Sequence, residues 1–148
     1  MEYRSSVSDS ATLQATYIQG VMPDVWRHGI SLFNSARFFD AHEAFEEVWR
    51  DAPRGTHLRR HIQGIVQLAV AFHHHSTGNP AGARSVLERA WRNLDGAEES
   101  FPELDLGRLR HALSPWRRYL QRDYSGEGPS PDLPQLLFRD QLFRDQSH

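Results

Sequence analysis

The chain has 148 residues, a formal net charge of −2 at neutral pH and no cysteine. All 17 of its basic residues are arginine. This length suits one compact domain with a hydrophobic core. The absence of cysteine excludes disulfides, thiolate zinc sites and cysteine nucleophiles. The absence of lysine excludes a Schiff-base enzyme and a P-loop.

Charge and hydropathy also limit the partners and the compartment. A pI near 6.5 argues against nucleic acid as a partner, because such proteins usually carry a basic domain or stripe. No apolar run reaches the roughly 20 residues that a membrane span requires. The N-terminus also lacks the apolar stretch of a signal peptide. We therefore expect a cytoplasmic protein without a membrane partner.

The elements follow one another as helices, and no segment has the pattern of a β-strand. Residues 1–22 predict a weakly ordered N-terminal extension, and Pro23 suits the start of a first helix. A second helix should end at Pro53–Gly55, and a long central helix should run over 56–77. A fourth begins near Pro80, and a last pair of short helices is separated at Ser114–Pro115. The predicted fold is an all-α, compact bundle of five to six helices.

Two of these helices resemble each other at an offset of 42 residues, as Ala41 with Ala83 and Trp49 with Trp91 show (83 − 41 = 42; 91 − 49 = 42). A small residue followed by a bulky one four positions later is typical of helical hairpin repeats such as the tetratricopeptide repeat, although that repeat is about 34 residues long. The sequence therefore predicts tetratricopeptide-like hairpins within one domain over 23–135. Residues 136–148 form a C-terminal extension in which Leu-Phe-Arg-Asp-Gln occurs twice in tandem.

The stretch FFDAHEAFEEVWRD, residues 38–51, carries the densest set of reactive side chains. On a helical wheel His42 and Glu46 lie at the edge of the apolar face, one turn apart, whereas Glu43 and Glu47 point to solvent. The central helix has its own polar stripe, formed by Gln63, Gln67 and His74. Because buried polar groups need partners, we expect His42 and Glu46 to be buried and to hydrogen-bond with Gln63 or Gln67.

His42 and Glu46 are the candidate catalytic residues, with Gln63, Gln67 and His74 as candidate ligand-binding residues. An imidazole and a carboxylate at i, i+4 can also bind one divalent metal ion. The His-Glu-x-x-His template of zinc proteases fails at Glu46, and the Glu-x-x-His elements of di-iron bundles are absent. A third ligand would come from the run His73–His75. The alternative is that this pair is only the polar edge of a packing helix.

Several spaced motifs resemble the bacterial and archaeal family called domain of unknown function 309, over roughly residues 26–135. The motifs are Phe33-Asn34, the helix with Ala41, His42, Glu43, Glu46 and Trp49, the stretch with Gln63, Gly64 and Gln67, and the stretch with Gly78, Asn79, Gly82 and Ala83. The resemblance implies an all-α fold of mostly five helices. It also implies the label of a predicted metal-dependent hydrolase, without an established reaction.

Two hypotheses for the function remain open at this point. In the first, the protein is a metal-dependent hydrolase or a small-ligand pocket centred on His42 and Glu46, with Glu46 or a metal-bound water as general base. In the second, it is a non-enzymatic helical interaction module or homo-oligomeric scaffold, which uses helix faces around Trp26, Trp91 and Trp116.

Overall fold

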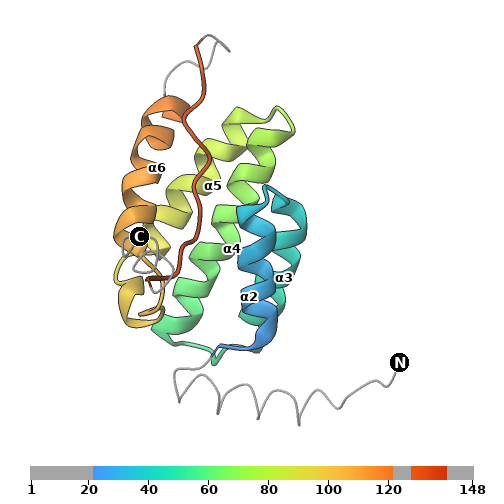
Figure 1. Cartoon of the computed structure of the whole chain (residues 1–148), viewed down its shortest axis with the longest axis vertical. Helices are drawn as coiled ribbons and strands as arrows, with labels where there is room; N and C mark the ends of the chain where they lie inside the picture. The colour runs from blue at the N-terminus through green and yellow to red at the C-terminus, as the bar shows by residue number, and fades with distance from the viewer. Residues whose placement is uncertain (1–21, 122–127, 140–148) are drawn as a thin grey trace, which may run out of the picture.

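The computed structural model describes residues 22–121 and 128–139, and these form five α-helices and one 3-10 turn (Figure 1). The helices are α2 (Asp24–Asn34), α3 (Phe38–Asp51), α4 (His57–Ser76), α5 (Pro80–Asn93) and α6 (Leu106–Gln121), and the turn is η1 (Ala97–Glu99). Within these ranges the only β-type pairing is an isolated antiparallel bridge between Leu104 and Phe138. The predicted all-α class is confirmed.

Local signals in the sequence explain where the helices begin. Thr56 caps α4 by accepting a hydrogen bond from the backbone N–H of Arg59 at 3.2 Å. Asn79 caps α5 in the same way through Gly82 N–H at 3.0 Å, and Pro80 occupies the first turn. The helix starts near Pro23 and Pro80 are therefore confirmed.

The prediction of two short helices separated at Ser114–Pro115 is wrong, because α6 continues through Pro115. Proline removes one helical hydrogen bond and normally breaks or kinks a helix. Here Leu113 and Trp116, on either side of this point, are both fully buried. Burial of these two side chains holds both halves of α6 against the bundle, so tertiary packing overrides the local signal.

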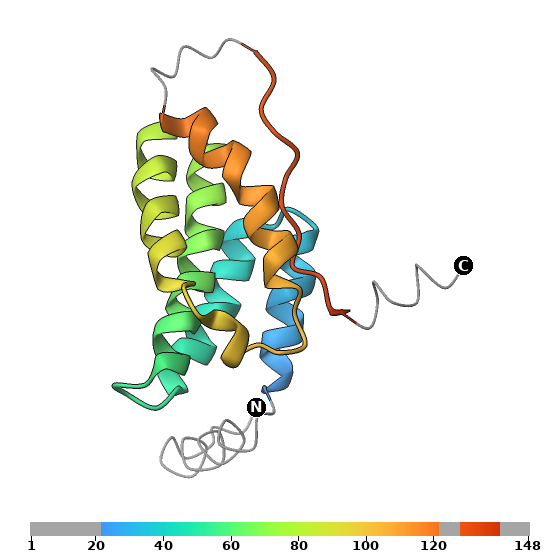
Figure 2. The ribbon, with the colours of Figure 1, turned by 90° about the vertical axis from the view of Figure 1, so that its left-hand side faces the viewer.

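The helices pack mainly on their neighbours in the chain, from α2 on α3 to α5 on α6, and α4 lies between α3 and α5 (Figures 1 and 2). The side of α4 that faces the core carries Ile62, Ile65, Leu68 and Phe72, each no more than 1% exposed. The central position predicted for this helix is confirmed. This order leaves α2 and α6 at the two ends of the series.

A C-terminal strap, residues 128–139, runs back along the bundle from the far end of α6 (Figure 2). The Asn34 side chain donates to the carbonyl of Leu136 at 2.9 Å and accepts from its N–H at 2.7 Å. Trp116 Nε1 donates to the carbonyl of Asp132 at 2.7 Å. The Leu136 side chain is 1% exposed, so the apolar start of the predicted C-terminal extension docks on the bundle.

Two of the predicted regions fall largely outside the described residues: 1–21 of the N-terminal extension and 140–148, which hold most of the tandem repeat. Within the residues that the structure does describe, none of the helices has the length and apolar character needed to cross a membrane.

Candidate functional site

His42 and Glu46 lie one turn apart on α3 and contact each other directly. The distance from His42 Nε2 to Glu46 Oε2 is 3.1 Å, and the side chains are 25% and 41% exposed. The other carboxylate oxygen of Glu46 lies 3.7 Å from Arg50. The structure therefore brings the two candidate catalytic residues together, but at the surface of the bundle and not inside it.

The predicted burial of this pair and its bond to Gln63 or Gln67 are wrong. Gln63 is exposed, and Gln67 accepts a hydrogen bond from the Asn93 side chain at 2.8 Å. His42 and Glu46 satisfy each other within one helix, which an i, i+4 spacing allows without any neighbour. Gln67 thus stabilises the α4–α5 interface instead.

His74 also turns away from the pair on α3. It lies at the C-terminal end of α4, where its Nδ1 is 3.2 Å from the side-chain nitrogen of Asn79, the residue that caps α5. The candidate ligand-binding residues of α4 therefore do not converge on His42 and Glu46. Gln67 instead contacts Asn93 at the end of α5, and His74 contacts Asn79 at its start.

His73 is the residue of α4 that is connected to the pair, because the ring of Phe39 contacts both His42 and His73. The sequence analysis did not consider Phe39. The Phe39 ring lies 5.8 Å from the His42 ring and 5.4 Å from the His73 ring, measured between centroids. Phe39 is 51% exposed, one of the two large apolar side chains exposed among the described residues. Phe39, His42, Glu46 and His73 form what we call the α3/α4 face.

The donor set of this face does not fit a metal centre with three protein ligands. In the described part of the chain, no three histidine, aspartate or glutamate side chains come close enough to hold one ion. His42 and Glu46 offer two donors that are bonded to each other, and a catalytic zinc site normally needs three. The α3/α4 face therefore offers a metal ion too few protein ligands for such a site.

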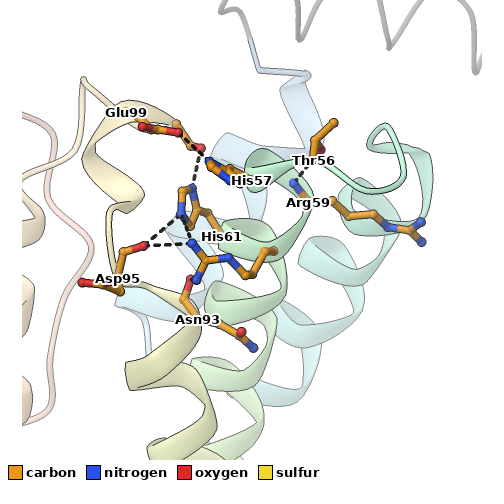
Figure 3. Close-up of polar contacts among 9 residues, drawn as sticks. Thr56, His57, Arg59, His61, Asn93, Asp95 and Glu99 are labelled. Carbon is orange, nitrogen blue, oxygen red and sulfur yellow. Dashed lines mark hydrogen bonds and ion pairs between the residues drawn. The ribbon is translucent and has the colours of Figure 1, made fainter.

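A second polar cluster surrounds His61 at the start of α4, and the sequence analysis missed it (Figure 3). His61 is 1% exposed and is the one buried polar side chain among the described residues. Its Nδ1 lies 2.6 Å from Ser100 Oγ and its Nε2 3.0 Å from the carbonyl of Asp95. Arg60 also donates to that carbonyl, at 3.3 Å. The cluster ties α4 to the connection between α5 and α6.

These partners determine the protonation state of His61. The Asp95 carbonyl only accepts, so it favours hydrogen on Nε2 with Nδ1 accepting from the Ser100 hydroxyl, whereas the Arg60 guanidinium only donates and, 3.2 Å from Nε2, favours the opposite tautomer. Burial lowers the pKa of His61 below its ordinary value of 6.5, and the bond to Asp95 opposes that shift only in part. His61 is therefore a neutral imidazole with both nitrogens satisfied, as expected of a structural residue.

A signal for His61 was present in the sequence. His61, Ile65, Leu68 and Phe72 recur at i, i+4, i+7 and i+11, so the histidine continues the apolar face of α4. A polar residue at such a position is buried and needs partners. Those partners lie more than 30 residues away, in a connection without periodicity, so the sequence could indicate the need but not Asp95 and Ser100.

The tryptophans proposed as an interaction surface belong mostly to the core. Trp26 and Trp116 are 1% and 0% exposed, so neither can contact a partner. Trp91 is partly buried, and the Arg117 guanidinium lies 4.2 Å from its ring. Trp49 is likewise partly buried, and the Arg59 guanidinium lies 4.2 Å from its ring. The interaction hypothesis therefore loses the residues first assigned to it.

Comparison with known proteins gives a family without an established activity. Residues 26–86 match the family described as domain of unknown function DUF309. The chain is 36% identical over 80 residues to the uncharacterized protein YpuF of Bacillus subtilis, which covers 52% of this chain and 45% of that protein. It is 28% identical over 81 residues to an uncharacterized protein of Aquifex aeolicus, covering 55% of this chain and 24% of that protein. The matched part thus spans less than half of either relative.

Over residues 26–86 the match confirms the resemblance predicted from the sequence. That range contains α2, α3, α4 and the first half of α5. It therefore includes His42, Glu46 and His61, but not the strap or the partners of His61 in the α5–α6 connection.

Proposed function

We propose that the α3/α4 face binds a small ligand, and that His42 is its acid/base group. The observation that carries this proposal is the direct contact between His42 and Glu46, 3.1 Å long, at side chains that are 25% and 41% exposed. Exposed ion pairs contribute little to stability, so the fold has little need of this one. A histidine held by a carboxylate and still open to solvent is suited to proton transfer.

The geometry favours His42 as the base and Glu46 as the group that orients it. Glu46 accepts the hydrogen on Nε2, which leaves Nδ1 as the nitrogen with a free lone pair. That nitrogen can accept a proton from a ligand O–H or N–H group, while the carboxylate stabilises the imidazolium that forms. These two roles differ from those inferred from the sequence, where Glu46 was the candidate base.

Phe39 indicates the kind of ligand. Its half-exposed ring lies between His42 and His73, so a ligand at Nδ1 would meet an apolar or flat surface beside the proton acceptor. A small molecule with one hydroxyl or amine next to an apolar part has this chemistry. The metal-dependent hydrolase has less support, because the described residues supply two donors and not three.

The test needs no known substrate, because the free nitrogen of a neutral imidazole attacks diethyl pyrocarbonate and becomes carbethoxylated. We expect it to modify His42 faster than exposed His111, measured by peptide mass spectrometry at pH 7. Glu46→Gln should slow the reaction of His42 because it removes the oriented carboxylate. Glu47→Gln, one position further along α3 and exposed, is the matched control and should leave the rate unchanged.

Equal rates for His42 and His111, unaffected by Glu46→Gln, would contradict the proposal. A second arm repeats the measurement with zinc chloride and with magnesium chloride. Protection of His42 by either ion, lost in Glu46→Gln, would restore the metal-site hypothesis despite the incomplete donor set.

The second candidate function is a helical interaction module, and it now depends on Phe39 instead of the tryptophans. A large exposed apolar side chain between two histidines suits contact with a protein surface. Light scattering across a range of concentrations separates the two functions. Association that Phe39→Ser abolishes would favour the module or a homo-oligomer. A monomer at all concentrations would favour the small-ligand site.

A further inference from the structure

A groove of about 510 Å³ lies between α6 and the C-terminal strap, which run side by side in Figure 2. Its apolar lining includes Pro115, Pro131 and Leu133, and the charged side chains of Arg118 and Asp132 also line it. Leu133 is 46% exposed and is one of the two large apolar side chains exposed in the described part of the chain. A groove of this size, with an apolar lining and a few charged groups, is typical of a small-molecule site.

The strap side of this groove is held firmly in place. Trp116 Nε1 donates to the carbonyl of Asp132 at 2.7 Å, and Pro134 and Leu136, which follow closely along the strap, are both buried. Leu133 is therefore exposed although its neighbours in the strap are anchored to the bundle. A groove that is formed before the ligand arrives reduces the entropy lost on binding.

The groove also contains two opposite charges that do not neutralise each other. Helix α6 carries four arginines and no carboxylate, and two of the four, Arg110 and Arg117, form ion pairs with glutamates of η1 and α5. Arg118 and Asp132 line the same groove, but within the described ranges neither forms an ion pair with the other or with a third residue. A guanidinium and a carboxylate are thus both available to a ligand.

The proline inside α6 adds a hydrogen-bond acceptor to the same groove. Pro115 has no N–H, so the carbonyl of His111, four residues earlier, lacks its regular helical partner. His111 also lines the groove. Arg118 follows Pro115 by three residues, which is about 4.5 Å along the helix axis. An acceptor for a cationic group and a donor for an anionic group therefore lie roughly one helical turn apart.

We infer that this groove binds a small zwitterion with an apolar body, namely an apolar α-amino acid. The carboxylate of the ligand meets the guanidinium of Arg118, and its ammonium group meets the carboxylate of Asp132 and the carbonyl of His111. Its apolar side chain lies on Pro131 and Leu133. The two charges of an α-amino acid are attached to one carbon, so they match protein groups that lie about one turn apart. No residue of the α3/α4 face takes part, and the inference does not depend on the proposed function.

The test uses the full chain and three probes that differ by one charge. The probes are L-phenylalanine, its amide, which lacks the carboxylate, and 3-phenylpropanoate, which lacks the ammonium group. Backbone amide chemical shifts of nitrogen-15-labelled protein locate and quantify the binding of each probe. We expect shifts at Ala112, Ser114 and Leu133, which line the groove. The affinity for L-phenylalanine should be at least about tenfold higher than for either analogue, since each analogue loses one charge-assisted hydrogen bond.

Substitutions at the surface assign each part of the ligand to its protein group. Arg118→Gln should weaken the binding of L-phenylalanine at least about tenfold and remove the preference over the amide. Arg108→Gln is the matched control, because Arg108 is also an exposed arginine of α6 but does not line the groove. Asp132→Asn should remove the preference over 3-phenylpropanoate, and Leu133→Ala should weaken all three probes alike. All four positions are exposed, and circular dichroism of each variant confirms that the domain remains folded.

Equal affinities for the three probes would overturn the inference, because the groove would then recognise only an apolar body. An equal loss in Arg108→Gln and Arg118→Gln would also overturn it, since a general attraction to the arginines of α6 would then explain the binding. Shifts confined to the amides around His42 would overturn it as well and would place the ligand on the α3/α4 face. The absence of any shift up to the solubility limit of L-phenylalanine would show that the groove does not bind this class of ligand.

Discussion

Two histidines on neighbouring helices, His61 and His42, illustrate two uses of the same side chain. His61 on α4 is 1% exposed, and both of its ring nitrogens have partners that come from the α5–α6 connection. His42 on α3 is 25% exposed and its one polar partner among the described residues is Glu46, on its own helix. A closed set of partners from distant segments stabilises a fold, whereas a half-open pair within one helix remains available to a ligand.

The largest effect that this comparison predicts is on stability. We expect His61→Ala to lower the free energy of unfolding by about 2–4 kcal/mol, because it leaves a cavity and removes the partner of Ser100 and one of the partners of the Asp95 carbonyl. His42→Ala should cost less than about 1 kcal/mol, as an exposed pair does. Urea denaturation followed by circular dichroism measures both. Equal losses would show that the two histidines do not differ as described.

The same comparison predicts how stability changes with pH. Burial lowers the pKa of His61 and of His75 below the ordinary value of 6.5. The unfolded state therefore binds protons at a higher pH than the folded state, and stability should fall as the pH drops below about 6.5. His61→Gln should flatten this part of the profile, whereas the same change at exposed His111 should not. A profile that is level between pH 8 and pH 5 would contradict the assignment.

We expect a separate loss of stability at more acidic pH. Arg117 holds the pKa of Glu88 below its ordinary value, and Arg110 does the same for Glu98, through hydrogen bonds to the carboxylates. For a carboxyl group with a depressed pKa, the stabilisation is present above pH 4.5 and is lost as the pH falls below it. Glu88→Gln should reduce the loss of stability below pH 4.5 and leave the loss caused by His61 below pH 6.5 unchanged. Urea titrations at pH 6 and pH 3 measure the two losses.

The sequence predicted well those features that depend on local patterns. Helix class, the starts near Pro23 and Pro80 and the central place of α4 follow from periodicity and caps. What it could not provide were contacts between distant segments. The single helix through Pro115, the clamp of Asn34 on Leu136 and the partners of His61 all join residues whose proximity is fixed only by tertiary packing.

In the candidate site, too, the local pattern was predicted correctly and the contacts between helices were not. The wheel placed His42 and Glu46 at the edge of the apolar face, one turn apart, and the structure confirms that they are neighbours. The expected convergence of Gln63, Gln67 and His74 did not follow, because a polar stripe on α4 can face α5 as well as α3. Gln67 accepts a hydrogen bond from Asn93 and His74 contacts Asn79, and these two asparagines lie at opposite ends of α5.

A smaller effect distinguishes the orienting role of Glu46 from a role in stability. Glu46→Gln and Glu47→Gln should each change the free energy of unfolding by no more than about 0.5 kcal/mol, as surface substitutions usually do. Only Glu46→Gln should change the ratio of the two neutral tautomers of His42, because the carboxylate favours hydrogen on Nε2. Nitrogen-15 chemical shifts of the imidazole ring measure that ratio. A tautomer ratio that is the same in wild type and Glu46→Gln would show that the contact does not orient His42.

Removing residues 1–22 should also have only a small effect on stability, and it tests our proposal that the helical domain begins at Pro23. The core of the described residues is complete without the N-terminal segment, since Trp26, Phe33 and Phe45 are each no more than 1% exposed. The truncated chain should therefore unfold cooperatively, with a loss below about 1 kcal/mol. Urea denaturation followed by circular dichroism measures that loss. A loss of cooperative unfolding would show that the domain boundary lies before Pro23.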